Sequence, residues 1–212
     1  ISSGATASLP AAGNVETTSV ALDGEADPSD VQSARLSRMT SITPGYLATC
    51  RIPLVRGREF NDSDNEKSQH VCLIDEDGAR AWFPNSDAIG HEVRFVGKPG
   101  EPIKRATIIG IVRRVIYDRL TDKRALPCVY VSQFQESDSF MSVVLRTRAD
   151  PRHYVKQARE AVLAANKDIP IYRVFTMQEV VQQSFWERKF FGVFFAIFAG
   201  LGISAKDHRP SA

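Results

Sequence analysis

The chain has 212 residues, of which 43% are hydrophobic and 25% are charged. This composition is typical of a globular protein and excludes a chain that is disordered throughout. Its net charge is only +2 and its 27 basic residues are scattered, whereas a nucleic-acid-binding protein usually gathers Lys and Arg on one face. Nucleic acid is therefore not an expected partner.

Strands are expected from the start of the chain. Residues 4–23 hold two apolar, β-branched runs separated by turn-forming residues, which predicts two strands and a turn. Residues 35–42 predict a further strand. Thr43 and Pro44 then predict a short helix, as its N-cap and its first residue. Residues 52–60 are expected to form an ordered connector.

The middle block is predicted to be rich in strands, with one helix. A buried strand at residues 71–74 leads into a helix at residues 76–83, which Pro84 ends. Further strands are expected at residues 92–96 and 106–112, paired with each other, and at residues 129–131.

The final third alternates strands and helices. A strand at residues 141–148 precedes a helix that Asp150 caps and Pro151 begins, and residues 171–175 predict another strand. Small and apolar residues recur every three or four positions in this helix and predict a face that packs on a sheet (Val155, Ala158, Val162 and Ala165).

These elements predict an α+β fold with two lobes. Residues 1–60 and 137–189 are expected to form the two halves of one α/β sandwich lobe. Residues 61–136 are expected to form a β-rich subdomain inserted between those halves.

The C-terminal segment predicts a long helix. Thr176 and Glu179 have capping-box spacing, with Phe175 and Val180 placed as a hydrophobic staple. Without a breaker the helix would run past Arg188 into the uncharged residues 190–205 and reach roughly 43 Å in length. Because that run is apolar on all sides, we predict the stub of a transmembrane helix; the alternative is a buried core helix.

The two ends suggest a chain cut from a larger protein. The sequence begins at Ile1, with neither a methionine nor a targeting segment. Residues 206–212 are polar and unrelated in pattern to the preceding run, as expected of a non-native or truncated tail.

Patterns typical of enzymes do not occur in the sequence. There is no G-x-x-x-x-G-K-[ST] loop for a nucleotide and no G-x-S-x-G elbow for a hydrolase nucleophile, so we expect no catalytic or cofactor-binding residues. Any ATP hydrolysis would belong to a partner. The three cysteines, Cys50, Cys72 and Cys128, lack metal-site spacing and are expected to be isolated thiols, with one disulfide as the alternative.

No metal site is expected. The four histidines lack ligand spacing (His70, His91, His153 and His208). Asp62, Asp64 and Glu66 have the spacing that opens a calcium loop, but Lys67 and Leu73 stand where that loop requires Gly and Glu. Solvated carboxylates and helix caps are the expected roles of these acidic residues.

One local concentration of basic residues lies near Tyr117. It comprises Arg113, Arg114, Arg119, Lys123 and Arg124. A solvated strand end is one interpretation. The functional alternative, for Arg113, Arg114, Arg119 and Arg124, is a docking surface for an acidic partner or for lipid head groups.

Five short landmarks occur in order along the chain. They are Pro44-Gly45-Tyr46; Ile52-Pro53-Leu54 with residues 56–60; Phe83-Pro84 with Ile89-Gly90; residues 108–112; and Thr176-Met177. In this order they resemble the periplasmic core domain of MacB/FtsX-type ABC transporter permeases. Many relatives carry a Gly-Asp pair where this chain has Arg113 and Arg114, which puts a tight turn there in doubt.

The resemblance implies a porter-like lobe with an inserted lobe, held outside the inner membrane between two transmembrane helices. It also implies three partners. They are an ABC ATPase, fused or separate, the rest of the permease, present as a dimer, and a periplasmic protein. The leading hypothesis is a non-enzymatic coupling module in which Thr176, Glu179 and Arg188 mark the coupling helix. A membrane-anchored sensor of small molecules or proteins is the alternative, and a secreted or anchored hydrolase is a remote one.

Overall fold

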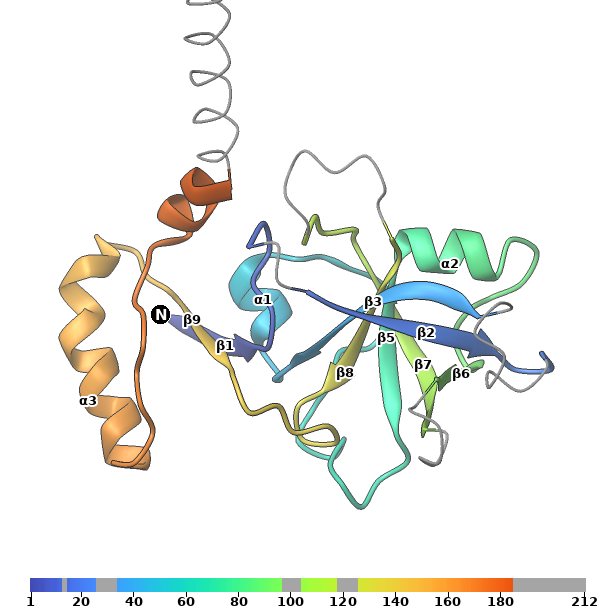
Figure 1. Cartoon of the computed structure of the whole chain (residues 1–212), viewed down its shortest axis with the longest axis horizontal. Helices are drawn as coiled ribbons and strands as arrows, with labels where there is room; N and C mark the ends of the chain where they lie inside the picture. The colour runs from blue at the N-terminus through green and yellow to red at the C-terminus, as the bar shows by residue number, and fades with distance from the viewer. Residues whose placement is uncertain (13–14, 26–33, 97–103, 118–125, 185–212) are drawn as a thin grey trace, which may run out of the picture.

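The computed structural model describes residues 1–12, 15–25, 34–96, 104–117 and 126–184. Within these residues, nine strands form one sheet in the order β2-β6-β7-β5-β8-β3-β1-β9, with β4 added beside β7 (Figure 1). The strands are β1 (Ser2–Thr6), β2 (Glu16–Leu22), β3 (Arg35–Ile42), β4 (Leu54–Gly57), β5 (Val71–Asp75), β6 (Glu92–Phe95), β7 (Lys104–Val112), β8 (Cys128–Ser132) and β9 (Ser142–Arg146). The helices are α1 (Tyr46–Cys50), α2 (Glu76–Trp82), the 3₁₀ helix η1 (Pro151–Tyr154) and α3 (Val155–Ala165).

Six of the described strands close into a barrel. β2 pairs with β6 at one edge and with β3 at the other, so the path through β6, β7, β5, β8 and β3 returns to β2. Every residue of β5 and of β8 is buried. The near-continuous apolar runs of these strands follow from burial on both faces of the sheet.

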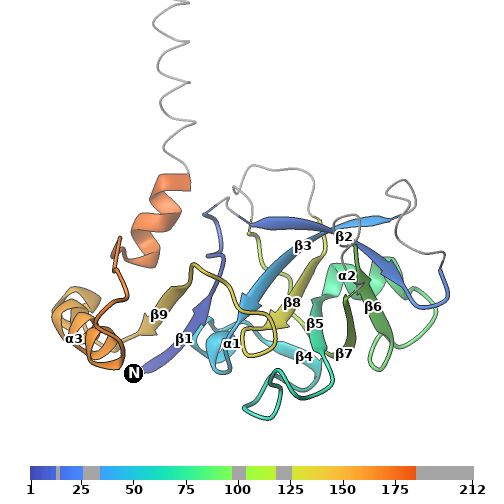
Figure 2. The ribbon, with the colours of Figure 1, turned by 60° about the horizontal axis from the view of Figure 1, so that its bottom comes forward.

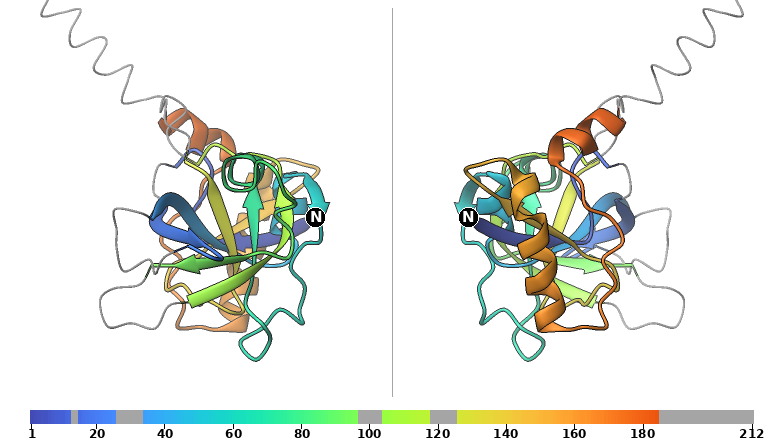
Figure 3. Two further views of the ribbon diagram at one scale, coloured as in Figure 1. Left: turned by 90° about the vertical axis from the view of Figure 1, so that its right-hand side faces the viewer. Right: turned by 90° about the vertical axis from the view of Figure 1, so that its left-hand side faces the viewer.

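A second part of the sheet projects from the barrel. β1 meets β3 through one bridge, between Thr6 and Ile42, and pairs along its whole length with β9. Figure 2 shows α3 beside this pair, on the side away from α2, and Figure 3 (right) shows α3 in front of it. We call β1, β9, η1 and α3 the wing.

Two apolar clusters fill the molecule. The first lies inside the barrel and includes Val20, Ile74, Val93, Ile108 and Val131, with Trp82 of α2 packed against them. The second lies on the outer face of β3, β8, β5 and β7, where α1 covers it with Tyr46 and Leu47. Burial of these side chains is the main favourable contribution to the free energy of folding.

Several predicted elements are confirmed. The strand at residues 35–42 has the predicted bounds. β6 and β7 form the expected antiparallel pair, with Glu92 opposite Thr107. The helix expected at residues 76–83 is α2, which ends at Trp82, just before Pro84.

The predicted cap of the first helix is wrong. α1 begins at Tyr46 with Gly45 as its N-cap, and no side chain caps it. The Thr43 hydroxyl instead accepts a hydrogen bond from the Ala5 amide at 2.8 Å, so it ties the chain to β1. Gly45 turns the chain into the helix with a φ of 81°, a conformation that glycine adopts without steric cost.

One further expectation is wrong, and two others gain detail. Residues 171–175 belong to no strand, because an alternating pattern makes a strand only where a sheet edge pairs with it. The connector at residues 52–60 contains a strand, β4. α3 has no fully buried residue, but Val155, Ala158 and Val162 of its predicted face are partly buried.

The predicted division into two lobes remains a prediction. The strands of residues 1–60 and of residues 61–136 belong to the same sheet, so the sheet crosses the expected boundary. The fold is a mixed arrangement of helices and strands. Within the described residues no helix is both long and apolar enough to cross a membrane, and residues 190–205 and 206–212 lie outside them.

Candidate functional site

Arg113 and Arg114 follow β7 and lie against the first turn of α2. Nε of Arg113 is 3.5 Å from Oε2 of Glu76, and Nε of Arg114 is 3.1 Å from Oδ2 of Asp77. Acidic residues are favoured in a first helical turn because they face the positive end of the helix dipole. The two arginines therefore meet carboxylates that the helix itself places there.

The rest of the predicted docking surface is not described. Arg119, Arg124 and the neighbouring Lys123 lie outside the described residues. Residues 113–117 leave β7 without a turn. Arg113 remains 62% exposed in its side chain, so docking by this surface stays a prediction.

Asp75 lies beneath this charged surface as the N-cap of α2. Its Oδ1 accepts a hydrogen bond from the Gly78 amide at 2.8 Å, although only 1% of the residue is exposed. Burial raises the pKa of Asp75 from 3.8 to about 6. Hydrogen bonds from the backbone amides of Gly78 and Cys128 lower the pKa, but by less than burial raises it. The carboxyl group thus changes charge near neutral pH.

The predicted capping box is present at the start of the last described helix, which covers residues 177–184. The Glu179 amide donates to the Thr176 hydroxyl at 3.2 Å. The Thr176 amide donates to the Glu179 carboxylate at 2.7 Å. Arg188, the third residue predicted for coupling, lies outside the described residues.

Glu179 also connects this helix to the wing. Its Oε1 accepts a hydrogen bond from Nη2 of Arg152, in η1, at 3.0 Å. The amide of Thr176, and then its hydroxyl, lower the pKa of Glu179, and Arg152 contributes further. One carboxylate therefore caps the helix and also pairs, at the surface, with the segment that begins α3.

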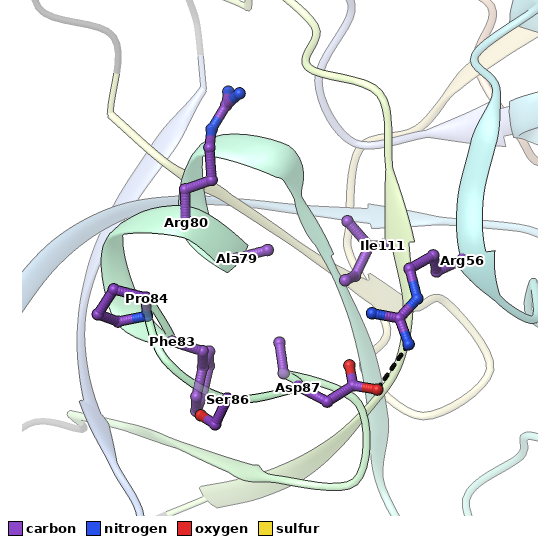
Figure 4. A pocket seen from close by; sticks show the side chains of 9 residues that line it. Arg56, Ala79, Arg80, Phe83, Pro84, Ser86, Asp87 and Ile111 are labelled. Atoms are coloured by element: carbon purple, nitrogen blue, oxygen red, sulfur yellow. Dashed lines mark hydrogen bonds and ion pairs between the residues drawn. The ribbon is translucent and has the colours of Figure 1, made fainter.

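A shallow hollow lies between α2 and the edge of the sheet at β4 (Figure 4). Its volume is about 290 Å³. Arg56 of β4 reaches across it to Asp87, with 2.7 Å between Nη2 and Oδ2. Figure 4 shows the apolar side chains of Ala79, from α2, and Ile111, from β7, lining the hollow beside the Arg56–Asp87 pair.

A second hollow adjoins the capping box. It has a volume of about 340 Å³ and is lined by Phe175, Glu179, Gln182 and Gln183. A site for a small molecule usually encloses most of its ligand. These two depressions are open at the surface and do not enclose a small ligand in this way.

The acidic residues of the 61–69 segment have structural roles. Both carboxylate oxygens of Asp64 accept hydrogen bonds from Arg58, at 2.7 and 2.8 Å, and one also accepts from the Asn61 amide at 2.9 Å. In the part of the chain that the structure describes, no group of three His, Cys, Asp or Glu residues could hold a metal ion. Cys50, Cys72 and Cys128 are thiols.

Sequence reasoning missed three features of these sites. The sequence marks Asp75 only as a residue before a helix; its burial and its hydrogen bond from the Cys128 amide of β8 come from the fold. The Arg152–Glu179 pair joins residues 27 positions apart, and the Arg56–Asp87 pair joins residues 31 positions apart. Spacing in the sequence cannot reveal such pairs, because the fold alone brings their elements together.

A known family matches most of this chain. The family model for the MacB-like periplasmic core domain matches residues 5–164. The chain belongs to this family. A search of curated protein sequences finds no match to this MacB-like domain.

Two solved structures resemble the MacB-like domain in fold. The periplasmic region of MacB from Actinobacillus actinomycetemcomitans matches with a TM-score of 0.50 and 15% identity, over 76% of this chain and 66% of that one. The extracellular domain of the noncanonical ABC-type transporter YknZ from Gram-positive bacteria matches with a TM-score of 0.52 and 17% identity, over 82% of this chain and 81% of that one. The MacB-like domain thus spans just under two thirds of the first structure.

Proposed function

We propose that this MacB-like domain is the extracytoplasmic part of an ABC transporter permease and couples movement of membrane helices to export or to other work in the periplasm. An ABC ATPase, fused or separate, would hydrolyse ATP. The observation that carries this proposal is the connection at Glu179, which caps the last helix and binds Arg152 of the wing. Movement of the helix would therefore act directly on the wing.

The proposed attachment to the membrane is inferred from the sequence. Residues 190–205 are uncharged, and a continuous helix from Met177 would lead into them. We propose that they begin a transmembrane helix of an inner-membrane protein, with the preceding domain facing the periplasm.

The partners are proposed to be the rest of the permease, as a dimer, and a periplasmic protein. Exposed apolar side chains concentrate in and around the wing: Ile1, Phe140, Val143, Leu145, Leu163, Ile169, Tyr172, Val174, Phe175 and Met177. Phe140 and Tyr172 pack against each other, with ring centroids 6.4 Å apart, yet are 73% and 74% exposed. A concentration of this kind is typical of a surface that other protein covers.

The arginine surface is proposed to dock an acidic partner or lipid head groups. Replacing Arg113, Arg114 and Arg119 by Glu would then abolish the activity that depends on this partner, with the domain still folded. Unchanged activity in such a folded variant would remove the docking role.

The coupling proposal is tested in the complete transporter by measuring the amount of substrate transported per ATP hydrolysed. Two glycines inserted at Arg188 weaken the helix by about 1 kcal/mol each, and we expect ATP hydrolysis to continue while transport is lost. The same insertion between Glu66 and Lys67, in an exposed loop, is the control. Full coupling in the Arg188 variant would contradict the proposal.

A second variant tests the connection itself. Arg152→Ala removes the side-chain partner of Glu179 and should lower the transport per ATP severalfold. Arg159→Ala, which removes an exposed arginine of the neighbouring α3, should leave it unchanged. Equal effects of the two substitutions would show that the Arg152 contact has no part in coupling.

A further inference from the structure

β9 is the last strand of the sheet, and its outer edge is free. Among the described residues it pairs with β1 alone. The backbone groups along such an edge can pair with a further strand. Val143 and Leu145 lie on one face of β9 and are 59% and 38% exposed, so the apolar surface beside this edge is also incompletely covered.

Residues 171–175, which we call the strap, lie between α3 and the last described helix. Their amides donate no hydrogen bond to any described residue. Four of the five residues are β-branched or aromatic, a composition that favours a strand (Ile171, Tyr172, Val174 and Phe175). Tyr172 is 74% exposed and Val174 is 45% exposed. The strap therefore has the composition of a strand and a backbone that is free to pair.

The strap runs in the same direction as β9. Near its start, the ring of Tyr172 packs against Phe140, which precedes β9, with 6.4 Å between the ring centroids. Just beyond its end, Glu179 binds Arg152 of η1, the element that follows β9, at 3.0 Å. Figures 1 and 3 show the strap returning alongside α3 toward the last helix. Corresponding ends of the strap and of β9 therefore lie near each other.

The order of β9, α3 and the strap is that of a βαβ unit. In such a unit a helix connects two neighbouring parallel strands and covers one face of both. Here α3 has no fully buried residue and Val143 stays exposed beside it, as expected where the second strand is missing from the sheet. Pairing of the strap with β9 would complete the unit and cover this apolar surface.

We propose that the strap is a conformational switch, which pairs in parallel with the free edge of β9 in one state of the transporter and is unpaired in the arrangement described here. In the paired state Tyr172 lies beside Val143 and Val174 lies beside Leu145. The capping box at Thr176 begins the last helix directly after the strap, so displacement of that helix pairs or releases the strap. The trigger rests on the proposed coupling function, whereas the pairing itself does not.

Disulfide cross-linking in the complete transporter tests the pairing. Neighbouring strands lie about 4.8 Å apart, which a disulfide can span, so Leu145→Cys with Val174→Cys should cross-link on mild oxidation. The matched control is Leu145→Cys with Arg173→Cys, because adjacent residues of a strand point to opposite faces. It should cross-link at least 10-fold more slowly. Both pairs are made with Cys50→Ser, since Cys50 is a partly exposed free thiol.

Two results would overturn the pairing. One is the absence of a disulfide between positions 145 and 174. The other is equal rates of cross-linking for the two pairs, which would show that the strap approaches β9 without adopting the geometry of a strand.

The switch is tested by the same pair in different nucleotide states. The rate of cross-linking between positions 145 and 174 should differ at least 3-fold between transporter with ADP and transporter with a non-hydrolysable ATP analogue. The completed disulfide should lower transport per ATP at least 5-fold, and a reducing agent should restore it. Equal rates in the two nucleotide states would overturn the switch. A selective, nucleotide-dependent disulfide that leaves transport per ATP unchanged would confirm the switch and contradict the coupling function instead.

Discussion

Asp75 is a buried carboxyl group whose charge should set part of the pH dependence of stability. Because burial raises its pKa from 3.8 to about 6, the folded state binds the proton more tightly than the unfolded state does. The free energy of unfolding should therefore fall by about 2 kcal/mol between pH 4 and pH 6 through this group. Above pH 6 the carboxyl group is ionised, and burial of this charge destabilises the folded state.

Replacing Asp75 by Asn tests this residue. The Asn side-chain oxygen can still accept from the Gly78 amide, so the helix cap is kept while the buried charge is lost. We expect the variant to be more stable than the wild type at pH 7.5, with little difference at pH 4, as measured by urea unfolding across this range. A difference in stability that does not vary with pH would contradict the assignment.

Among the elements, β4 depends on a particular backbone conformation at Gly57, which has a φ of 79° and whose added Cβ would lie 2.2 Å from the Ile109 carbonyl oxygen. Gly57→Ala should reduce the free energy of unfolding by clearly more than the about 1–2 kcal/mol that a left-handed conformation costs a residue with a Cβ atom. Gly24 has a similar φ of 80° but nothing within 4 Å of its added Cβ. Gly24→Ala therefore measures the conformational cost alone, and equal losses in the two variants would contradict the close approach of β4 to β7.

The last described helix depends on its cap. Thr176→Ala removes the acceptor of the Glu179 amide and should destabilise the start of the helix by about 1 kcal/mol. Hydrogen exchange of the amides of residues 177–180 should then accelerate roughly 5-fold. Ser184→Ala, in the same helix, removes only a hydroxyl that donates to the Val181 carbonyl at 2.7 Å. If both variants exchange alike, the capping box does not stabilise this helix.

At the scale of the whole molecule, the barrel and the wing should differ in local stability. All residues of β5 and β8 are buried, whereas α3 has no buried residue. The amides of α3 should therefore exchange with solvent on the order of 100-fold faster than those of β5, because local opening there exposes little apolar surface. Equal exchange rates would show that the wing and the barrel unfold as one unit.

The local elements and the family could be predicted from the amino-acid sequence alone. Alternating and apolar runs located most strands, Thr176 and Glu179 marked a helix start that the structure confirms, and ordered landmarks indicated the MacB-like family that the match over residues 5–164 shows. These features depend on neighbours within a few positions along the chain, where backbone geometry fixes which groups can meet.

The pairing of these elements could not be predicted from the sequence and is seen in the folded structure. This structure closed six strands into a barrel across the expected lobe boundary, left residues 171–175 without a partner strand, and brought Arg152 to Glu179 and Arg56 to Asp87. These pairings could not be predicted because strand pairing and ion pairing depend on which strand edges and side chains become neighbours once the core is packed. No residue carries that information alone, since each contact is shared between segments far apart in the chain.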